Sequence, residues 1–222
     1  MQKSRIKSKE RIREHGEVFT AEREVKAMCD LVKDETERID SRFLEPACGD
    51  GNFLAEILTR KLASVRRKYK KSVLDYEKNA VLAASSIYGV DIMLDNVIVC
   101  RERIFGIWDK EYKAVCKKDC NEQTRNAVKY ILSKNIVCGN ALTLKCVDEN
   151  GNDTDEPIVF SEWAFITGSQ MQRQDYTFAH LLEMNDEKKT AKQLSAFDEK
   201  EEEGRFLRRY VTHYRSVQEN ER

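Results

Sequence analysis

Three short apolar segments, each of which ends in a pattern of glycine and polar residues, constrain the fold of this chain most strongly. They are RFLEPA at 42–47, SIYGVDI at 86–92 and NIVCGNAL at 135–142. The stretches between them carry apolar residues at helical spacing and are expected to be helices, over 53–71, 76–84, 94–116 and 124–132. Strands that alternate with helices indicate parallel βαβ units. The sequence therefore predicts an α/β fold with a central, largely parallel, doubly wound sheet.

The flanking segments are expected to differ from this core. Residues 3–14 indicate a short basic helix or arm, and Thr20 is placed as the N-cap of a following helix. LTLKCV at 142–147 and PIVFSEWAFI at 157–166 predict two strands joined as a hairpin by a polar loop. Residues 174–195 are expected to form a helix, and 198–210 a solvated helix end or tail.

This pattern predicts three regions along the chain. Residues 1–40 would supply a basic arm and capping helices, and residues 41–142 the α/β core. Residues 143–222 would be an insertion, or the remainder of a domain that is incomplete on its C-terminal side. Such a sheet would have an open edge, so self-association is expected.

The charge balance, the apolar runs and the cysteine content limit which classes of protein this chain can belong to. Lys and Arg number 39, and so do Asp and Glu, so any affinity for nucleic acid must come from local patches such as RRKYKK at 66–71 or from other chains. No apolar run is long enough for a membrane span or a signal peptide, which favours a cytoplasmic protein. The seven cysteines form no CxxC pair and lie far in sequence from the three histidines, so reduced thiols are expected and no metal site is predicted.

The turn EPACGDGNF at 45–53 is the first candidate binding element. Gly49 and Gly51 allow a tight turn and a close approach of backbone to ligand. The helix that follows would present unpaired N–H groups to a carboxylate, a phosphate or a ribose. A dinucleotide fingerprint would require a third glycine where Leu54 stands, so that interpretation fails.

Polar residues end the next two strands. Asp91 could accept both hydroxyls of a ribose, and the amide of Asn140 could bind an adenine edge. Because parallel strands end at a shared crevice, these side chains are expected to lie close to the glycine turn.

These motifs together resemble a known family. HGEVFTAEREVKAM at 15–28, followed by FLEPACGDGNFLAEIL at 43–58, is similar to the opening of gamma-type adenine-specific DNA methyltransferases of restriction–modification systems. Members of that family typically carry, in order along the chain, the motif HGxxFTP, the motif (D/E)PACGxGxF, an acidic residue at a strand end and the motif G(D/N)AL. The resemblance covers residues 13–142 in the same order. It implies a Rossmann-like class I methyltransferase fold with S-adenosylmethionine as the cofactor.

The resemblance also implies roles for nine residues. Thr20 would contact the methionine carboxylate, Asp91 would hold the ribose, and Asn140 would contact the adenine. The methionine moiety would be surrounded by Glu45, Ala47, Gly49 and Gly51, and apolar packing would come from Phe19 and Ile92.

The chain departs from the family in one decisive respect. The family catalyses methyl transfer with an (N/D/S)PP(Y/F) loop, whose polar groups bind the target amino group and whose ring stacks on the flipped base. Here the two prolines, Pro46 and Pro157, are not adjacent, and SEW at 161–163 and QDY at 174–176 lack prolines. The roughly 80 residues after Asn140 are too few for a target-recognition domain, so none is expected within them. Ala21 and Asn140, where the family prefers proline and an acid, are milder departures. No catalytic residue is therefore predicted.

Three interpretations follow from these residues. The chain is the cofactor-binding portion of an adenine DNA methyltransferase, with DNA contacts and a catalytic or recognition subunit supplied by other parts. Alternatively, it is a stand-alone S-adenosylmethionine-binding or regulatory protein. The third interpretation is a non-catalytic interaction scaffold on a methyltransferase-derived fold, for which the basic arm and the charged tail would be the working surfaces.

Overall fold

Three parallel strands form the centre of the computed structural model, which describes residues 20–183 and 206–221. They are β1 (Phe43–Glu45), β2 (Ile87–Asp91) and β3 (Ile136–Cys138), with β2 in the middle. Leu44 lies beside Tyr88, and Val90 lies beside Val137. The predicted α/β fold with parallel strands is confirmed, and the arrangement is compatible with a Rossmann-like fold. Within the described ranges no strand pairs with the outer edge of β1.

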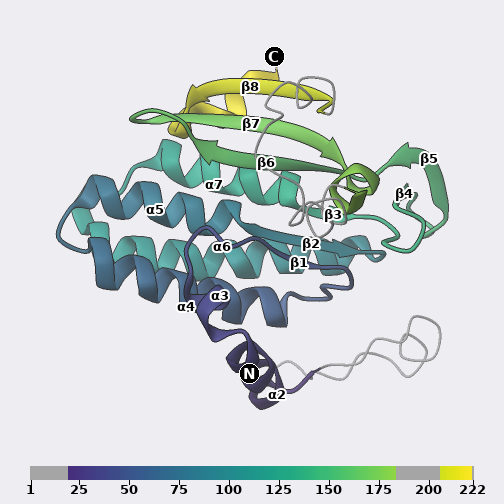
Figure 1. Ribbon diagram of the computed structural model, residues 1–222, viewed down its shortest axis with the longest axis horizontal. Helices are drawn as coiled ribbons and strands as arrows, with labels where there is room; N and C mark the ends of the chain where they lie inside the picture. Colours follow the sequence, from purple (N-terminus) through teal and green to yellow (C-terminus); the bar gives the residue numbers. More distant parts are fainter. Residues whose placement is uncertain (1–19, 184–205, 222) are drawn as a thin grey trace, which may run out of the picture.

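The predicted helices between the strands are all present. They are α4 (Asn52–Tyr69), α5 (Val73–Ser85), α6 (Leu94–Cys116) and α7 (Glu122–Asn135), with the short 3-10 turn η1 (Lys117–Asp119) between the last two. Ser72 caps α5 by accepting from the N–H of Asp75, and Asn121 caps α7 in the same way. Helix α5 leads directly into β2, and α7 into β3 (Figure 1).

The N-terminal helix begins one residue later than its sequence indicates. Helix α2 (Glu22–Leu31) has Ala21 as its N-cap, and the Glu24 carboxylate accepts from the Ala21 N–H at 3.2 Å. Thr20 was expected to be the N-cap, but the cap is Ala21, and the side chain of Glu24, three residues after it, accepts from its N–H. The short helix α3 (Lys33–Glu37) then leads to β1. The basic arm predicted at 3–14 lies outside the described residues.

The hairpin predicted after residue 142 forms, but its second strand is not the one expected at 157–166. Strand β4 (Lys145–Val147) pairs with β5 (Asp153–Pro157), which comes from the segment expected to be loop. Asp148 makes the tight turn, because its carboxylate accepts from the N–H groups of Asn150 and Asn152, at 2.8 and 2.9 Å. Strand β5 is exposed and polar, so no apolar alternation marked it in the sequence.

A second, antiparallel sheet replaces the helix and the tail expected after residue 166. It consists of β6 (Val159–Phe165), β7 (Gln170–Thr177) and β8 (Arg208–His213), in that order, and is followed by the 3-10 segment η4 (Tyr214–Glu221). The predicted helix at 174–195 is therefore wrong at its start, where β7 continues to Thr177. Residues 178–183 are helical and 184–195 lie outside the described part. The segment from 208 onward is a paired strand rather than a tail.

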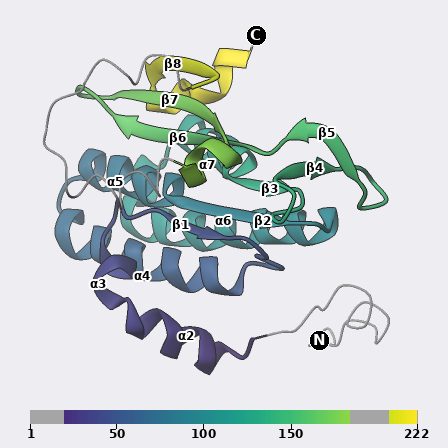
Figure 2. The same ribbon diagram turned by 45° about the vertical axis from the view of Figure 1, so that its right-hand side comes forward.

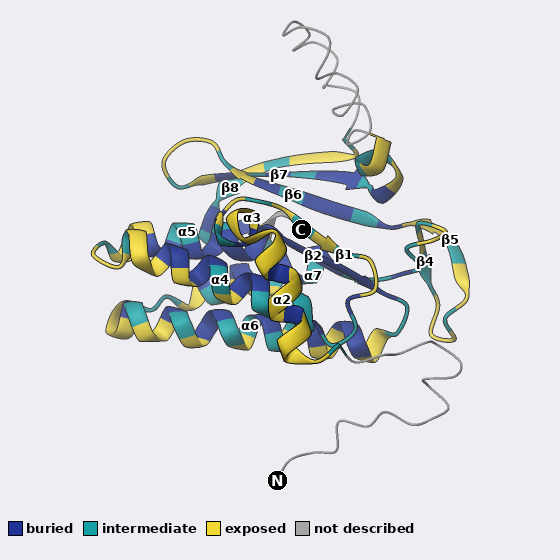
Figure 3. Ribbon diagram, turned by 60° about the horizontal axis from the view of Figure 1, so that its bottom comes forward, coloured by how far each residue is buried: buried dark blue, intermediate teal, exposed yellow. Residues whose placement is uncertain are grey.

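The core lies between these layers. One side of β2 packs against helices, and the Cys48 and Leu54 side chains approach Gly89 there. On the other side Tyr88 and Val90 pack on Ile158, Phe160 and Phe178. Figure 2 shows the second sheet lying above β2 and β3. Figure 3 shows buried residues along β2 and β6 and exposed ones on the outer side of α2. Trp163, Met171, Tyr214 and Val217 join the same core as the helices. None of the helices described here is long and apolar enough to cross a membrane.

Candidate functional site

The glycine turn leads from β1 into α4. Its backbone is fixed by two hydrogen bonds, from Cys48 N to Val90 O at 2.9 Å and from Gly51 N to Cys48 O at 2.8 Å. Gly49 has φ +52° and Gly51 has φ +84°, a region that favours glycine. The turn therefore needs glycine at both positions for conformational reasons.

The two glycines differ in what surrounds them. A Cβ on Gly51 would lie 2.6 Å from the Cys100 sulfur, so that glycine is also required for packing against α6. A Cβ on Gly49 would meet nothing within 4 Å. The space beside Gly49 is thus open, as a turn that receives a ligand requires.

Asp91, at the end of β2, joins the strand to this turn. Its Oδ2 accepts from Gly49 N at 2.8 Å, and its Oδ1 accepts from Met93 N at 2.9 Å and from Asn96 Nδ2 at 3.1 Å. The residue is buried. Two predicted site residues that are 42 positions apart in sequence are therefore in direct contact. A carboxylate has about four acceptor positions, so three donors leave Asp91 capacity for one more.

Unsatisfied polar groups lie at both ends of the turn, one in β1 and the others at the start of α4. The half-buried Glu45 carboxyl has no hydrogen bond or ion pair with any described residue, and desolvation raises its pKa. The first three N–H groups of α4, at Asn52, Phe53 and Leu54, have no acceptor within the described part of the chain. A half-buried carboxyl beside free helix N–H groups can bind a ligand that carries both an amino and a carboxylate group.

Asn140 lies at the end of β3 but turns into the hairpin. Its Nδ2 donates to Asp153 Oδ1 at 3.1 Å, and its Oδ1 accepts from Leu142 N at 3.0 Å. The strand end next to Asn140 contacts β2 through Gly139 N, which donates to Asp91 O at 3.0 Å. The structure therefore gives the Asn140 amide a local turn role.

The remaining predicted residues are less informative. Ala47 is exposed and Ile92 is half-buried, and the Ile92 carbonyl accepts from the Cys138 thiol at 3.6 Å. Thr20 is half-buried just ahead of α2, and Phe19 lies outside the described residues.

Helix α6 contributes residues that the sequence analysis did not single out. Arg103 Nη1 donates to Asn52 Oδ1 at 2.7 Å and pairs with Asp50 Oδ1 at 3.3 Å, which ties the turn to α6. Asn96, Cys100 and Arg103 occupy positions i, i+4 and i+7 of this helix. That spacing places the three side chains on one face of α6, in the helix that follows Asp91. The same spacing could have identified them from the sequence.

The basic cluster at 66–71 is remote from the turn. It ends α4, whose other end begins at the glycine turn, and 18 helical residues at 1.5 Å each span about 27 Å. Arg66 and Arg67 also pair with Glu111 and Glu37. The cluster is therefore not placed to hold nucleic acid at the turn.

Comparisons with known proteins add no family to this geometry. No protein-family model, curated protein or solved structure matches the chain. All seven cysteines carry free thiols, and the described residues contain no group of three or more His, Cys, Asp or Glu arranged to hold a metal ion.

Proposed function

We propose that this chain is the S-adenosylmethionine-binding portion of an adenine-specific DNA methyltransferase, without the loop that performs methyl transfer. One observation carries the proposal: the contact between the Asp91 carboxylate and Gly49 N, which joins two of the motifs on which the resemblance rests.

The residues around the turn fit the chemistry of this cofactor. The free N–H groups at the start of α4 suit the methionine carboxylate, and the unpaired Glu45 carboxyl suits the methionine ammonium. The remaining acceptor capacity of Asp91 suits a ribose hydroxyl. The bound cofactor would supply an electrophilic methyl group. Asn140 fits least well, because both ends of its amide are already engaged.

The catalytic positioning of adenine would come from another chain or segment. The flipped adenine amino group attacks the methyl directly, so what catalysis requires is a loop that holds the base in line. None of the residues at the turn supplies adjacent prolines and an aromatic ring.

A second candidate function is a non-catalytic scaffold that binds no cofactor. It is favoured by one observation, that the Asp91 carboxylate already accepts three internal hydrogen bonds and so has a complete structural role. A stand-alone cofactor-binding or regulatory protein would share the site of the first proposal and differ only in its partner.

Calorimetric titration with S-adenosylmethionine tests the proposal. Saturable binding is expected, and Asp91→Ala should weaken it by about 1–3 kcal/mol, the cost of unpairing a buried polar group. Gly49→Ala is the sharper variant, because its methyl would fill the open space beside the turn without meeting protein atoms. It should weaken binding while leaving the fold intact.

Gly168→Ala is the matched control. Gly168 has φ +58° and equally open surroundings, but it lies in the β6–β7 turn. Gly168→Ala should reduce the free energy of unfolding by the same backbone strain as Gly49→Ala, and it should leave cofactor binding unchanged. Absence of binding at millimolar cofactor, or equal losses in the two glycine variants, would overturn the proposal in favour of the scaffold.

A further inference from the structure

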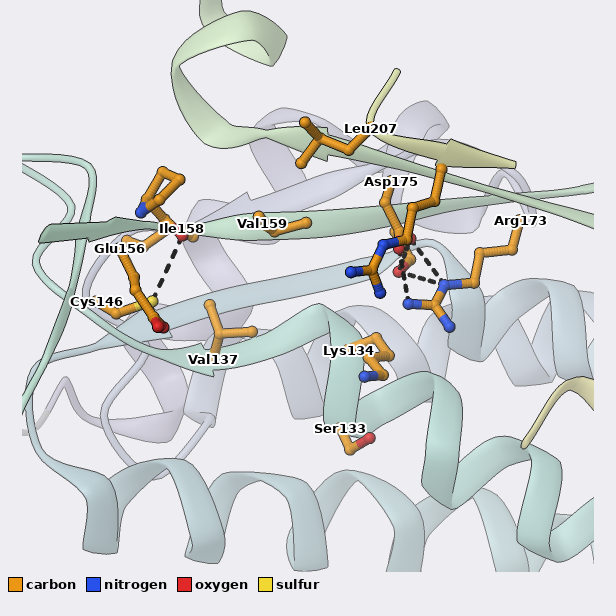
Figure 4. Close-up of a pocket in the computed structure, with 13 residues that line it drawn as sticks. Ser133, Lys134, Val137, Cys146, Glu156, Ile158, Val159, Arg173, Asp175 and Leu207 are labelled. Carbon is orange, nitrogen blue, oxygen red and sulfur yellow. Dashed lines mark hydrogen bonds and ion pairs between the residues drawn. The ribbon is translucent and has the colours of Figure 1, made fainter. Parts of the chain in front are cut away.

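A cavity of about 390 Å³ lies between the parallel sheet and the second sheet. In Figure 4 the α7–β3 segment, which carries Ser133, Lys134 and Val137, forms one wall. The strands that carry Val159, Arg173 and Asp175 face it. None of the residues that line the cavity belongs to the glycine-turn site, so the two sites are separate.

One side of the cavity is formed by a buried ion pair whose two charges neutralise each other. Arg173 and Asp175 form a two-point ion pair, with Nε–Oδ1 at 2.7 Å and Nη2–Oδ2 at 2.8 Å, and their side chains are only 6% and 5% exposed. The Ser161 hydroxyl also donates to Asp175 Oδ1, at 2.6 Å. The Arg173 guanidinium lies over the rings of Tyr130, Trp163 and Tyr210, which hold it in place. Because the two charges of this pair cancel, the net charge of the cavity depends on the residues at its rim.

The rim carries more positive than negative charge. Lys134 and Arg208 line it together with one carboxylate, that of Glu156. Arg208 is exposed and forms no ion pair with any residue in the described ranges. Its neighbour Arg209 instead donates to Gln172 Oε1, at 3.1 and 2.7 Å, and does not line the cavity. The Arg208 guanidinium can donate to an acceptor in the cavity.

Apart from the hydroxyl of Ser133, the rest of the lining is largely apolar. Val137, Ile158, Val159 and Leu207 contribute aliphatic carbon, and no aromatic residue lines the space. At about 30 Å³ for each water-sized unit, the volume accommodates on the order of ten non-hydrogen atoms. An aliphatic chain fits this wall better than a nucleobase, which would require an aromatic platform.

We propose that this cavity binds a small organic anion, an aliphatic carboxylate or phosphate ester whose charged group meets Arg208 and whose carbon chain packs on Val137, Ile158 and Leu207. Lys134 adds positive charge at the entrance. The charged group would form charge-assisted hydrogen bonds, which are stronger than neutral ones. The proposal is independent of the function of the glycine turn.

Titration of the full chain with hexanoate, butyl phosphate and neutral hexanamide tests this site. At least one anion should saturate the protein at millimolar concentration or below, and hexanamide should not. Binding of hexanoate alone would identify a carboxylate site, and binding of butyl phosphate alone a phosphate-ester site. Arg208→Gln should weaken binding about tenfold, the loss expected on removing one charge-assisted hydrogen bond.

Two further variants keep the test specific. Arg209→Gln removes the same charge from the next residue outside the cavity and should leave the dissociation constant unchanged. Val159→Phe should block the cavity without altering its charge and should abolish binding. Failure of both anions to saturate at 10 mM, or equal weakening by the two arginine variants, would overturn the proposal.

Discussion

At the scale of single residues, a buried polar side chain holds the segment that precedes β1 and the glycine turn. Lys61 of α4 is fully buried, and its Nζ donates to Arg38 O, Ile39 O and Ser86 Oγ at 3.1, 3.2 and 2.9 Å, and also to Ser41 O. Its stem spans the space between α4 and the segment before β1. One lysine thus positions the start of the central sheet.

Lys61 should make stability depend on pH. Burial lowers the pKa of Lys61 to about 7, from 10.5 in the unfolded chain. Between these values the unfolded chain binds the extra proton, so the contribution of this lysine to stability should rise as pH rises from 7. The rise is at most about 1.4 kcal/mol per pH unit. Urea unfolding at pH 7 and pH 9 should show this rise in the wild type relative to Lys61→Met.

The comparison with the variant isolates the lysine. Burial raises the pKa of Cys29 and Cys116, so these thiols act in the opposite direction, losing stability as the unfolded cysteines ionise. Both proteins share that loss. A wild type and variant with the same pH dependence would show that Lys61 stays protonated in the fold.

The two glycines of the turn should respond differently to alanine. Gly49→Ala should cost about 1–2 kcal/mol, because only the left-handed backbone is strained. Gly51→Ala should cost about 1–3 kcal/mol more, because its Cβ would overlap the Cys100 sulfur. Cys100→Ala in the Gly51→Ala background should recover part of that extra loss. Denaturant midpoints would check this order, and equal costs would contradict it.

At the scale of elements, the C-terminal segment is tied to the helices through one buried carboxylate. Glu77 of α5 accepts from the hydroxyls of Tyr112 in α6 and Tyr214 in η4. Arg215 adds an ion pair, with Nη2 at 2.6 Å from Glu77 Oε1. Helices α5 and α6 and the sequence-distant segment η4 therefore meet at the Glu77 side chain, which is 1% exposed.

Removing the arginine should leave that charge uncompensated. Arg215→Ala is expected to destabilise the fold by about 3 kcal/mol, in the range for breaking a buried ion pair. The double variant Arg215→Ala with Glu77→Gln should be more stable than Arg215→Ala alone, because the buried charge is gone, the amide oxygen still accepts from one tyrosine hydroxyl and the amide NH2 can donate to the other. Chemical denaturation of the three proteins would check this, and a double variant less stable than Arg215→Ala would contradict it.

At the scale of the whole molecule, the second sheet completes the core. Tyr214 and Val217 are buried among the helices, and Phe165 contacts Tyr214 edge-on, at 5.7 Å between ring centroids. A chain ended at residue 183 should therefore lose its cooperative unfolding transition and bind a hydrophobic dye, as expected for lost core packing. A truncated chain with an unchanged urea transition would show that this segment is dispensable.

The proposed function predicts a binding protein that is inactive alone. Incubated with S-adenosylmethionine and adenine-containing DNA, the chain should produce no N6-methyladenine by mass spectrometry, because it has no adjacent prolines and aromatic ring to position the base. A complete adenine methyltransferase in the same buffer serves as the positive control. Methylation by the wild type above that by Asp91→Ala would contradict this prediction.

The parallel sheet, its helices and the position of the glycine turn could be predicted from the amino-acid sequence. Their signals are local: apolar residues at helical spacing in α4 and α6, and short apolar strands that end in glycine and a polar residue. The contact of Asp91 with the turn follows from the same pattern, because parallel strands end at one edge.

The second sheet and the cavity beneath it could not be predicted from local sequence patterns. Strand β7 buries alternate residues, but two of its core positions are Arg173 and Asp175, so the alternation has no apolar signature in the sequence. These charges can be buried because they neutralise each other and lie among aromatic rings from α7, β6 and β8. That compensation depends on residues far apart in the chain, and local patterns carry no information about it.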